Sequence, residues 1–193
     1  LINIIIRIVI INMKLLSSFI PIKNEFIIKE DGRKILGEFR LCNILGEGSF
    51  GKVFLAIHEL TQEKVAIKVL KKKTLVKNLD YERVWKEISI LKKLYHSHIC
   101  QLYYVIETNS YICLVMEYVN GIDLMSRIRR DGAFNEIEAV IIFSQILSAL
   151  DYLHKNNIAH RDIKLDNILL TANNEIKLID FGLAKCISDQ TYY

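Results

Sequence analysis

The chain has 193 residues, enough for one or two domains, and 25% charged with 51% hydrophobic residues is ordinary for a globular protein. A net charge of +4 without a clustered basic face gives no indication of nucleic-acid binding. The four cysteines lie far apart and form no CxxC pair, so neither a zinc site nor a disulfide framework is indicated. A reducing, cytoplasmic compartment is therefore expected.

The N-terminal segment LINIIIRIVII is strongly apolar, but Arg7 interrupts it. A membrane span needs about 20 apolar residues, so residues 1–37 are expected to be a strand-like or disordered leader. Translated upstream sequence before Met13 is an alternative, and a membrane anchor is the less favoured one. Because the chain begins with Leu1 and reaches Tyr193 within a polar stretch, a fragment or an incomplete gene model is expected.

Residues 39–69 follow a strand pattern. LCNILGEGSFGKVFLAIH predicts a hairpin around a glycine-rich turn, and EKVAIKVL predicts a third strand because it alternates and is rich in β-branched residues. Residues 101–108 and 110–118 predict two more strands. The first half is therefore expected to be a small, mostly antiparallel sheet.

One helix is predicted within this half, over residues 81–95, with Asp80 as its cap. Apolar residues recur there at i, i+4, i+7 and i+11, which is one face of a helix. These residues are Val84, Ile88, Leu91 and Tyr95.

The second half is predicted to be mainly helical. DLMSRIRRDG predicts a helix that ends at a Gly132 cap, and residues 136–157 predict a long helix that is apolar on most sides and therefore buried. Residues 167–172 and 175–181 predict a short hairpin. HRDIKLDN, residues 160–167, lies between the long helix and this hairpin, where a loop held at both ends can carry charges at fixed positions.

Residues 46–53 have the pattern GxGxxGxV. The glycines alone are equally compatible with a tight turn. Dinucleotide binding needs a helix after the motif, and here a strand follows. A glycine-rich hairpin can still place backbone N–H groups over phosphates.

Lys68 is the one lysine in the apolar run VAIK. A buried ammonium needs an anionic partner, and Glu87 at the boundary of the next helix can supply it. Alternatively, Lys68 lies at a strand edge with its ammonium in solvent, and Glu87 is an ordinary solvated helix glutamate.

Five motifs in order resemble the eukaryotic protein kinases. They are the glycine loop at 46–53, VAIK at 65–68, the helix glutamate Glu87, HRDIKLDN at 160–167 and Asp-Phe-Gly at 180–182. The resemblance covers residues 39–193, about four fifths of the chain. It is of serine/threonine type and is similar to the calcium/calmodulin-dependent and AGC-like groups.

The resemblance implies an α+β, protein-kinase-like bilobal fold. Residues 38–118 would form a complete small lobe, an antiparallel sheet plus one helix. Residues 119–193 would form an incomplete helical large lobe, truncated after the Asp-Phe-Gly motif. Because the helices that would cover it are missing, the helix at 135–156 is expected to expose apolar surface.

The resemblance also implies transfer of the γ-phosphate of Mg–ATP to a protein hydroxyl. Asp162 would accept the proton of the substrate hydroxyl, and Lys164 would neutralise charge on the transferring phosphate. Asn167 and Asp180 would hold Mg²⁺. His160 would buttress the loop and not bind metal.

The nucleotide site follows from the same resemblance. Lys68 would hold the inner phosphates and be fixed by Glu87, and the segment 114–119 would grip adenine through its backbone, with Met116 as gatekeeper. For these positions, ordinary core or surface packing is the alternative. The residues assigned to ATP are Gly46, Glu47, Gly48, Ser49, Phe50, Gly51, Val53, Ala66, Lys68, Met116, Glu117, Val119, Asp123 and Leu169.

The implied partners are a protein substrate with a serine or threonine and, because Arg161 suggests activation by a phosphorylated loop residue, an upstream activating kinase. Thr191 is a weak candidate for that residue, since the better site would lie beyond Tyr193. The alternative function is a catalytically silent nucleotide-binding or interaction module derived from a kinase.

Overall fold

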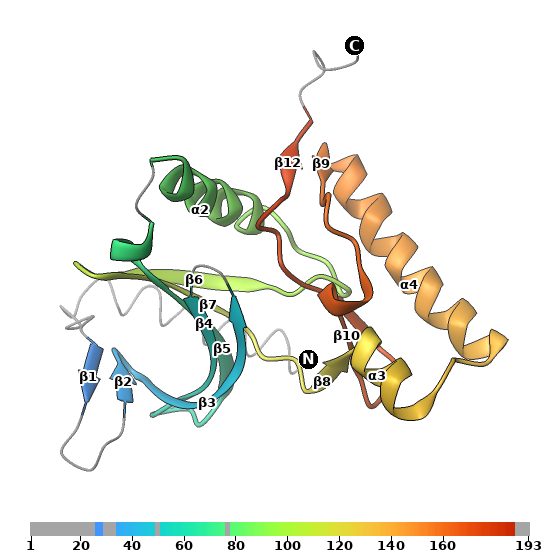
Figure 1. The fold of residues 1–193 in the computed structure, drawn as a ribbon, viewed down its shortest axis with the longest axis horizontal. Helices are drawn as coiled ribbons and strands as arrows, with labels where there is room; N and C mark the ends of the chain where they lie inside the picture. The colour runs from blue at the N-terminus through green and yellow to red at the C-terminus, as the bar shows by residue number, and fades with distance from the viewer. Residues whose placement is uncertain (1–25, 29–33, 49–50, 76–77, 188–193) are drawn as a thin grey trace. The chain divides into compact units, whose positions relative to one another are not determined.

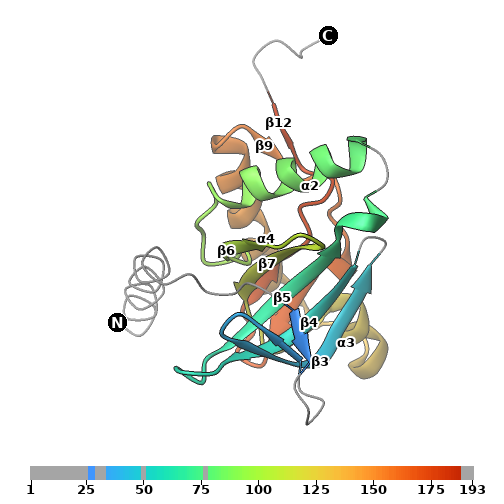
Figure 2. The same ribbon diagram turned by 90° about the vertical axis from the view of Figure 1, so that its left-hand side faces the viewer.

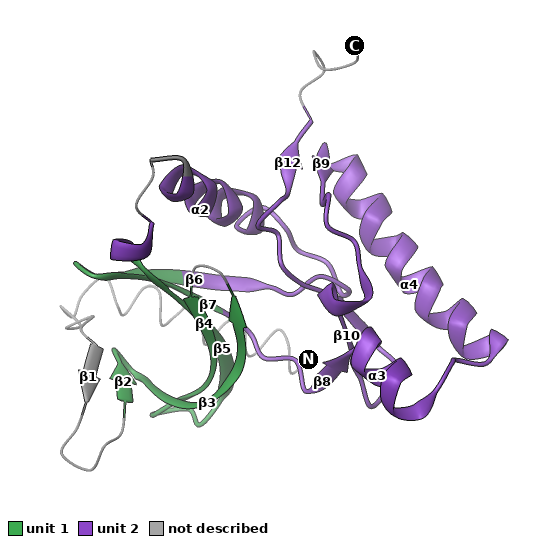
Figure 3. Ribbon diagram, in the orientation of Figure 1, with its two compact units in different colours: residues 1–71, 105–115 green, residues 72–104, 116–193 purple. Residues whose placement is uncertain are grey.

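The computed structural model describes residues 26–28, 34–48, 51–75 and 78–187 (Figure 1). The N-terminal apolar segment, Ser49, Phe50 and Thr191 lie outside the described residues. Two compact units make up the chain, residues 1–71 with 105–115 and residues 72–104 with 116–193 (Figure 3). The lobe boundaries expected from the resemblance, 38–118 and 119–193, stay predictions.

A curled sheet dominates the first unit (Figure 2), and its strand order is β1-β2-β3-β4-β5-β7-β6. The paired strands from β1 to β5 are antiparallel, so the predicted hairpin, third strand and antiparallel sheet are confirmed. Strands β1 and β2 are three residues each, too short for a sequence pattern. The strands are β1 (Phe26–Ile28), β2 (Lys34–Leu36), β3 (Phe39–Gly48), β4 (Gly51–His58), β5 (Lys64–Lys71), β6 (Leu102–Glu107) and β7 (Tyr111–Glu117).

Strand β5 forms the middle of this unit's core. Val65, Ala66, Ile67, Val69 and Leu70 are all buried, which reflects the near-continuous apolar run of a strand covered on both faces. Lys68 is the partly exposed residue among them. The strand therefore holds the lysine backbone rigidly on both sides.

Helix α2 (Asn78–Leu91) follows a short 3-10 turn, η1 (Lys72–Thr74). The expected range of 81–95 with Asp80 as cap is wrong at both ends, because Asp80 lies inside the first turn, where its carboxylate pairs with Arg83 at 3.8 Å. After Leu91 the backbone tightens to i→i−3 bonds, which turns Tyr95 out of the apolar stripe and into solvent.

Helices α3 and α4 of the second unit agree with the predicted ranges. Helix α3 (Leu124–Asp131) begins after Asp123, whose carboxylate accepts the Ser126 N–H, and ends at Gly132 with a φ of 83°. Helix α4 (Glu136–Lys155) begins with a capping box between Asn135 and Glu138.

Helix α4 has two unlike faces. Ile142, Ala149 and Leu153 are buried, so the expectation that the whole helix is buried is wrong, and the expectation of exposed apolar surface is confirmed. By length and composition alone, α4 could also cross a membrane, a test that core helices of soluble proteins pass as well. The large apolar residues that it exposes are Ile137, Val140, Ile141, Phe143 and Leu147.

Two pairs of short strands hold the loops of the second unit. Strand β9 (Ile158–Ala159) pairs with β12 (Lys185–Cys186), and β10 (Ile168–Thr171) pairs with β11 (Ile176–Leu178), all antiparallel. The third strand of the β10 sheet is β8 (Gly121–Asp123). The segment from β9 to β10 and the segment from β11 to β12 are thus joined at both ends, which brings two loops side by side.

Candidate active site

The loop from β9 to β10 carries HRDIKLDN and closes in the 3-10 turn η2 (Leu165–Asn167). Asn167 is 6% exposed, and its Nδ2 donates to Asp162 twice, to the backbone O at 2.9 Å and to Oδ2 at 2.8 Å. One buried amide therefore fixes both the backbone and the carboxylate of Asp162.

Asp162 and Lys164 form an ion pair within this loop, with Nζ 3.0 Å from Oδ2. The Lys164 ammonium, and after it the Asn167 amide, lower the pKa of Asp162, while Asp162 raises the pKa of Lys164. Both groups are consequently charged at neutral pH. The result is an ionised carboxylate with a cation beside it on a fixed backbone.

His160 supports the HRDIKLDN loop through hydrogen bonds of both ring nitrogens. Its ring is 2% exposed, Nε2 donates to Ile179 O at 3.1 Å, and Nδ1 accepts the Asp162 N–H at 3.3 Å. Desolvation lowers the pKa of His160, which favours the neutral ring that this bonding needs. The ring also meets Phe181 edge-on, with centroids 4.6 Å apart. In this geometry His160 buttresses the loop.

The loop from β11 to β12 carries Asp180 and is bonded to the HRDIKLDN loop. The Ile179 N–H donates to Asn167 O at 2.9 Å, and Arg161 Nε donates to Leu183 O at 2.7 Å. Asp180 has a φ of 59°, in the left-handed region that few non-glycine residues adopt and in which Asp is enriched. Asp180 directly follows Ile179, whose N–H bonds to Asn167, so the backbone next to Asp180 is held against the HRDIKLDN loop.

The oxygen donors of these two loops suit Mg²⁺. Asp162 takes both bonds of the Asn167 amide nitrogen, which leaves the amide oxygen as the atom that can bind a cation, and Asp180 adds a carboxylate. Within the described part of the chain, no three His, Cys, Asp or Glu residues are grouped so as to hold a metal. Mg²⁺ bound to phosphates needs only one or two protein carboxylates, so the set fits a phosphate-bound ion.

Glu87 of α2 lies near the Asp180 loop. Its side chain is buried, and its Oε2 would be 3.8 Å from a Cβ placed on Gly182. The same Cβ would lie 3.2 Å from the Asp180 carboxylate. A glycine at 182 therefore keeps the space between two carboxylates clear of a side chain.

Two kinds of glycine occur in the hairpin between β3 and β4. A Cβ on Gly51 would stand 2.0 Å from Val69 O, so the close approach of β4 to β5 requires glycine there. Among the residues that the structure describes, a Cβ on Gly46 would meet nothing within 4 Å. The packing of the described residues therefore gives no reason for glycine at position 46.

The strand register gathers several of the residues predicted for the nucleotide. Gly46 pairs with Val53 across β3 and β4, and Val53 pairs with Lys68 across β4 and β5. Direct cross-strand partners project to the same face, as do residues two apart in a strand. Val53, Lys68 and Ala66 therefore share one face of the sheet.

The remaining predicted positions lie in the second unit. Asp123 and Leu169 are direct partners between β8 and β10, and the Asp123 carboxylate already accepts the Ser126 N–H at 2.8 Å as the cap of α3. Glu117 pairs with Lys177, a residue for which the sequence motifs predict no role. The pairing of Lys68 with Glu87 stays a prediction, as do the binding roles of the individual residues.

The loop that holds the charged Asp-Lys pair is bonded to a second loop that carries Asp-Phe-Gly, an arrangement that agrees with the resemblance to protein kinases. The family model described as protein kinase domain matches residues 39–193. Over 156 residues the chain is 46% identical to an SNF1-related protein kinase catalytic subunit alpha, KIN12, from Arabidopsis thaliana. The match covers 80% of this chain and 31% of that relative.

The chain belongs to the eukaryotic protein kinases, of the serine/threonine type. A curled antiparallel sheet followed by a few helices agrees with the expected α+β, protein-kinase-like fold. The narrower assignment to the calcium/calmodulin-dependent or AGC-like groups is not confirmed by an SNF1-related relative.

Proposed function

We propose that this chain carries the ATP-binding and catalytic loops of a kinase that transfers the γ-phosphate of Mg–ATP to a serine or threonine hydroxyl of a protein. The observation that carries the proposal is the Asp162 carboxylate, which Asn167 fixes and Lys164 keeps ionised. An ionised carboxylate at a fixed position can orient a hydroxyl group and accept its proton.

Each residue has a role that its observed chemistry supports. Lys164 stands beside Asp162 as a cation and would offset negative charge that develops near the transferred group. Asn167 and Asp180 would hold the metal, and Lys68 the inner phosphates. When bound, Mg–ATP supplies the phosphoryl group, and its Mg²⁺ neutralises the negative charge that develops on the phosphates during transfer.

By the resemblance to the family, Val53, Ala66 and Leu169 would contact the base, and the backbone of residues 116–119 would hold it. Gly46 and Gly48 have room that their own chain does not fill, which suits a close approach to phosphates. The further proposals are a protein substrate, an upstream activating kinase and a cytoplasmic location, with a membrane anchor as the less favoured alternative. No nucleic-acid partner is proposed.

Thermal unfolding with Mg–ATP tests this function. We expect Mg–ATP to stabilise the wild-type chain by about 2.7 kcal/mol at a ligand concentration of 100 Kd. The Asp180→Ala variant should lose the part of this stabilisation that depends on magnesium. Lys68→Met should abolish phosphotransfer by the full-length kinase while the fold remains intact. Phosphotransfer at the wild-type rate by Lys68→Met would disprove the role given to Lys68.

The alternative function is a silent nucleotide-binding or interaction module, which the exposed apolar face of α4 favours because such a surface suits a partner. It predicts Mg–ATP binding without transfer to any protein substrate. A transfer assay with a mixture of serine and threonine peptides and labelled ATP separates the two, since label on peptide occurs only for the enzyme.

A further inference from the structure

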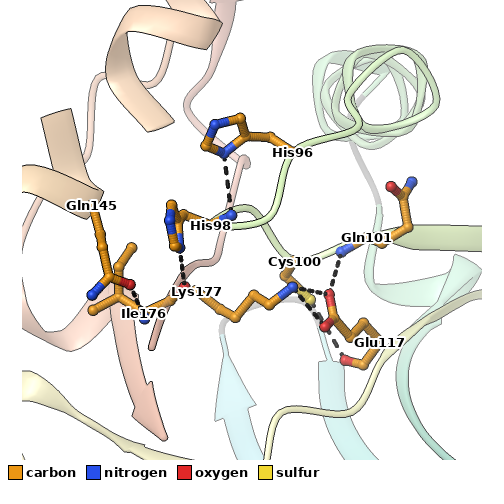
Figure 4. A network of polar contacts seen from close by, with 8 residues as sticks. All are labelled: His96, His98, Cys100, Gln101, Glu117, Gln145, Ile176 and Lys177. Carbon is orange, nitrogen blue, oxygen red and sulfur yellow. Dashed lines mark hydrogen bonds and ion pairs between the residues drawn. The ribbon is translucent and has the colours of Figure 1, made fainter. Parts of the chain in front are cut away.

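Lys177 of β11 forms a compact ion pair with Glu117 at the end of β7 (Figure 4). Its Nζ lies 2.7 Å from Oε1 and 2.9 Å from Oε2 of Glu117. The two side chains are 17% and 23% exposed, so both charges have lost most of their water. Removal of one partner from such a pair leaves the other charge without compensation in a poorly solvated place.

Glu117 is also held through its backbone. Its Oε2 accepts the Gln101 N–H at 3.2 Å, and its own N–H donates to Gln101 O at 2.9 Å. The Cys100 thiol donates to Glu117 O at 3.5 Å, and desolvation raises the pKa of Cys100 to about 12, so the thiol keeps its proton. The position of residue 117 is thus fixed at the side chain and at both backbone groups.

The strand that carries Lys177 is equally well fixed. His98 Nδ1 donates to Ile176 O at 3.3 Å, and the Leu178 N–H donates to His98 O at 2.9 Å. The Cys100 N–H donates to Leu178 O at 3.0 Å. Lys177 therefore projects from a backbone that is bonded on either side of it, and it can act as a rigid anchor.

We infer that Lys177 is a positioning residue for nucleotide binding, which acts through Glu117 on the backbone of residues 117–119. The inference rests on the proposed function, which assigns this backbone to the adenine base. Lys177 also precedes Asp180 by three residues in the sequence. One ion pair thereby ties the base-binding segment to the strand that leads into the metal-binding loop.

The test compares the binding of adenosine and of Mg–ATP to the full chain by calorimetry. Lys177→Met should weaken both ligands by the same factor, about tenfold, because misplacement of the base-binding backbone affects the part that they share. Lys177→Arg keeps the charge and should recover most of the affinity.

Lys155→Met is the matched control. Lys155 pairs with Asp151 at the same N···O distance of 2.7 Å, but both side chains are exposed, at 74% and 61%. Exposed pairs contribute little, so this variant should bind both ligands as the wild type does. Glu117→Gln covers the case in which Lys177→Met does not fold, because it keeps an oxygen for the Gln101 N–H, and it should show the same loss.

Unchanged or tighter adenosine binding by Lys177→Met, or by Glu117→Gln where Lys177→Met does not fold, would overturn the inference. So would a loss confined to Mg–ATP, which would mean that the lysine acts on the phosphates. If the wild-type chain binds neither ligand, the proposed function fails and the inference fails with it. A wild type that binds both ligands, with variants that bind them equally well, overturns the inference alone.

Discussion

At the scale of single residues, the glycines of the β3–β4 hairpin separate the demands of folding from those of a ligand. Gly51→Ala should lower the free energy of unfolding by about 3 kcal/mol, because its Cβ would overlap Val69 O and part β4 from β5. Gly46→Ala should leave stability nearly unchanged and weaken Mg–ATP binding. Urea unfolding and calorimetry of the two variants check this. Equal loss of stability in both would contradict it.

The sequence predicts functional residues where they form a motif of charged side chains. The loop 160–167 was placed correctly between a helix and a hairpin because its charges stand out against apolar neighbours. Lys177 was missed, since a lysine at a strand position in EIKLIDF is as compatible with solvent as with a partner. Its partner Glu117 is 60 residues away, and only the folded chain brings the two together.

At the scale of elements, the two faces of α4 should respond differently to the same change. Leu153 is fully buried, so Leu153→Ala should lower the free energy of unfolding by about 3 kcal/mol through the cavity that it leaves. Ile137 is 74% exposed, so Ile137→Ala should change stability by less than about 0.5 kcal/mol. Chemical denaturation of both variants gives the comparison. A large effect of Ile137→Ala would mean that this face is covered.

The elements with a clear period or alternation were predicted almost completely, namely β3, β4, β5, β7, α3 and α4. The short strands β8, β9 and β12 were not, because two or three residues carry no pattern and their pairing depends on distant partners. The end of α2 was also misplaced. Tyr95 continues the apolar spacing, but the helix ends four residues earlier, at Leu91, and no glycine marks that point.

At the scale of the whole molecule, two histidines make stability depend on pH. Desolvation lowers the pKa of His160 below the ordinary 6.5. Desolvation also lowers the pKa of His96, and the nearby charges of His98 and Lys177 lower it further. Each ring also accepts a backbone N–H at Nδ1, a bond that protonation removes. The unfolded chain therefore binds protons first as the pH falls. The stability that neutral rings provide is complete above about pH 6.5 and declines as the pH falls toward the folded-state pKa values.

Urea unfolding at a series of pH values between about 8 and 5 measures this decline. The double variant His96→Gln, His160→Gln should be less stable at pH 8 but show a flatter dependence. A wild type whose unfolding free energy stays constant over this range would show that neither ring resists protonation in the folded chain.

The two pairs of short strands have a further consequence, for the tolerance of the chain to added residues. The entropic cost of closing a loop grows only with the logarithm of its length. The tip between β10 and β11, residues 172–175, belongs to neither catalytic loop. Extra residues there would lengthen only this turn, while the pairs β9–β12 and β10–β11 would still hold the ends of both catalytic loops. The same insertion within 160–167 would displace Asp162 from Asn167. We therefore expect the chain to tolerate insertions at this hairpin tip and to lose the geometry of the site when residues are inserted within 160–167.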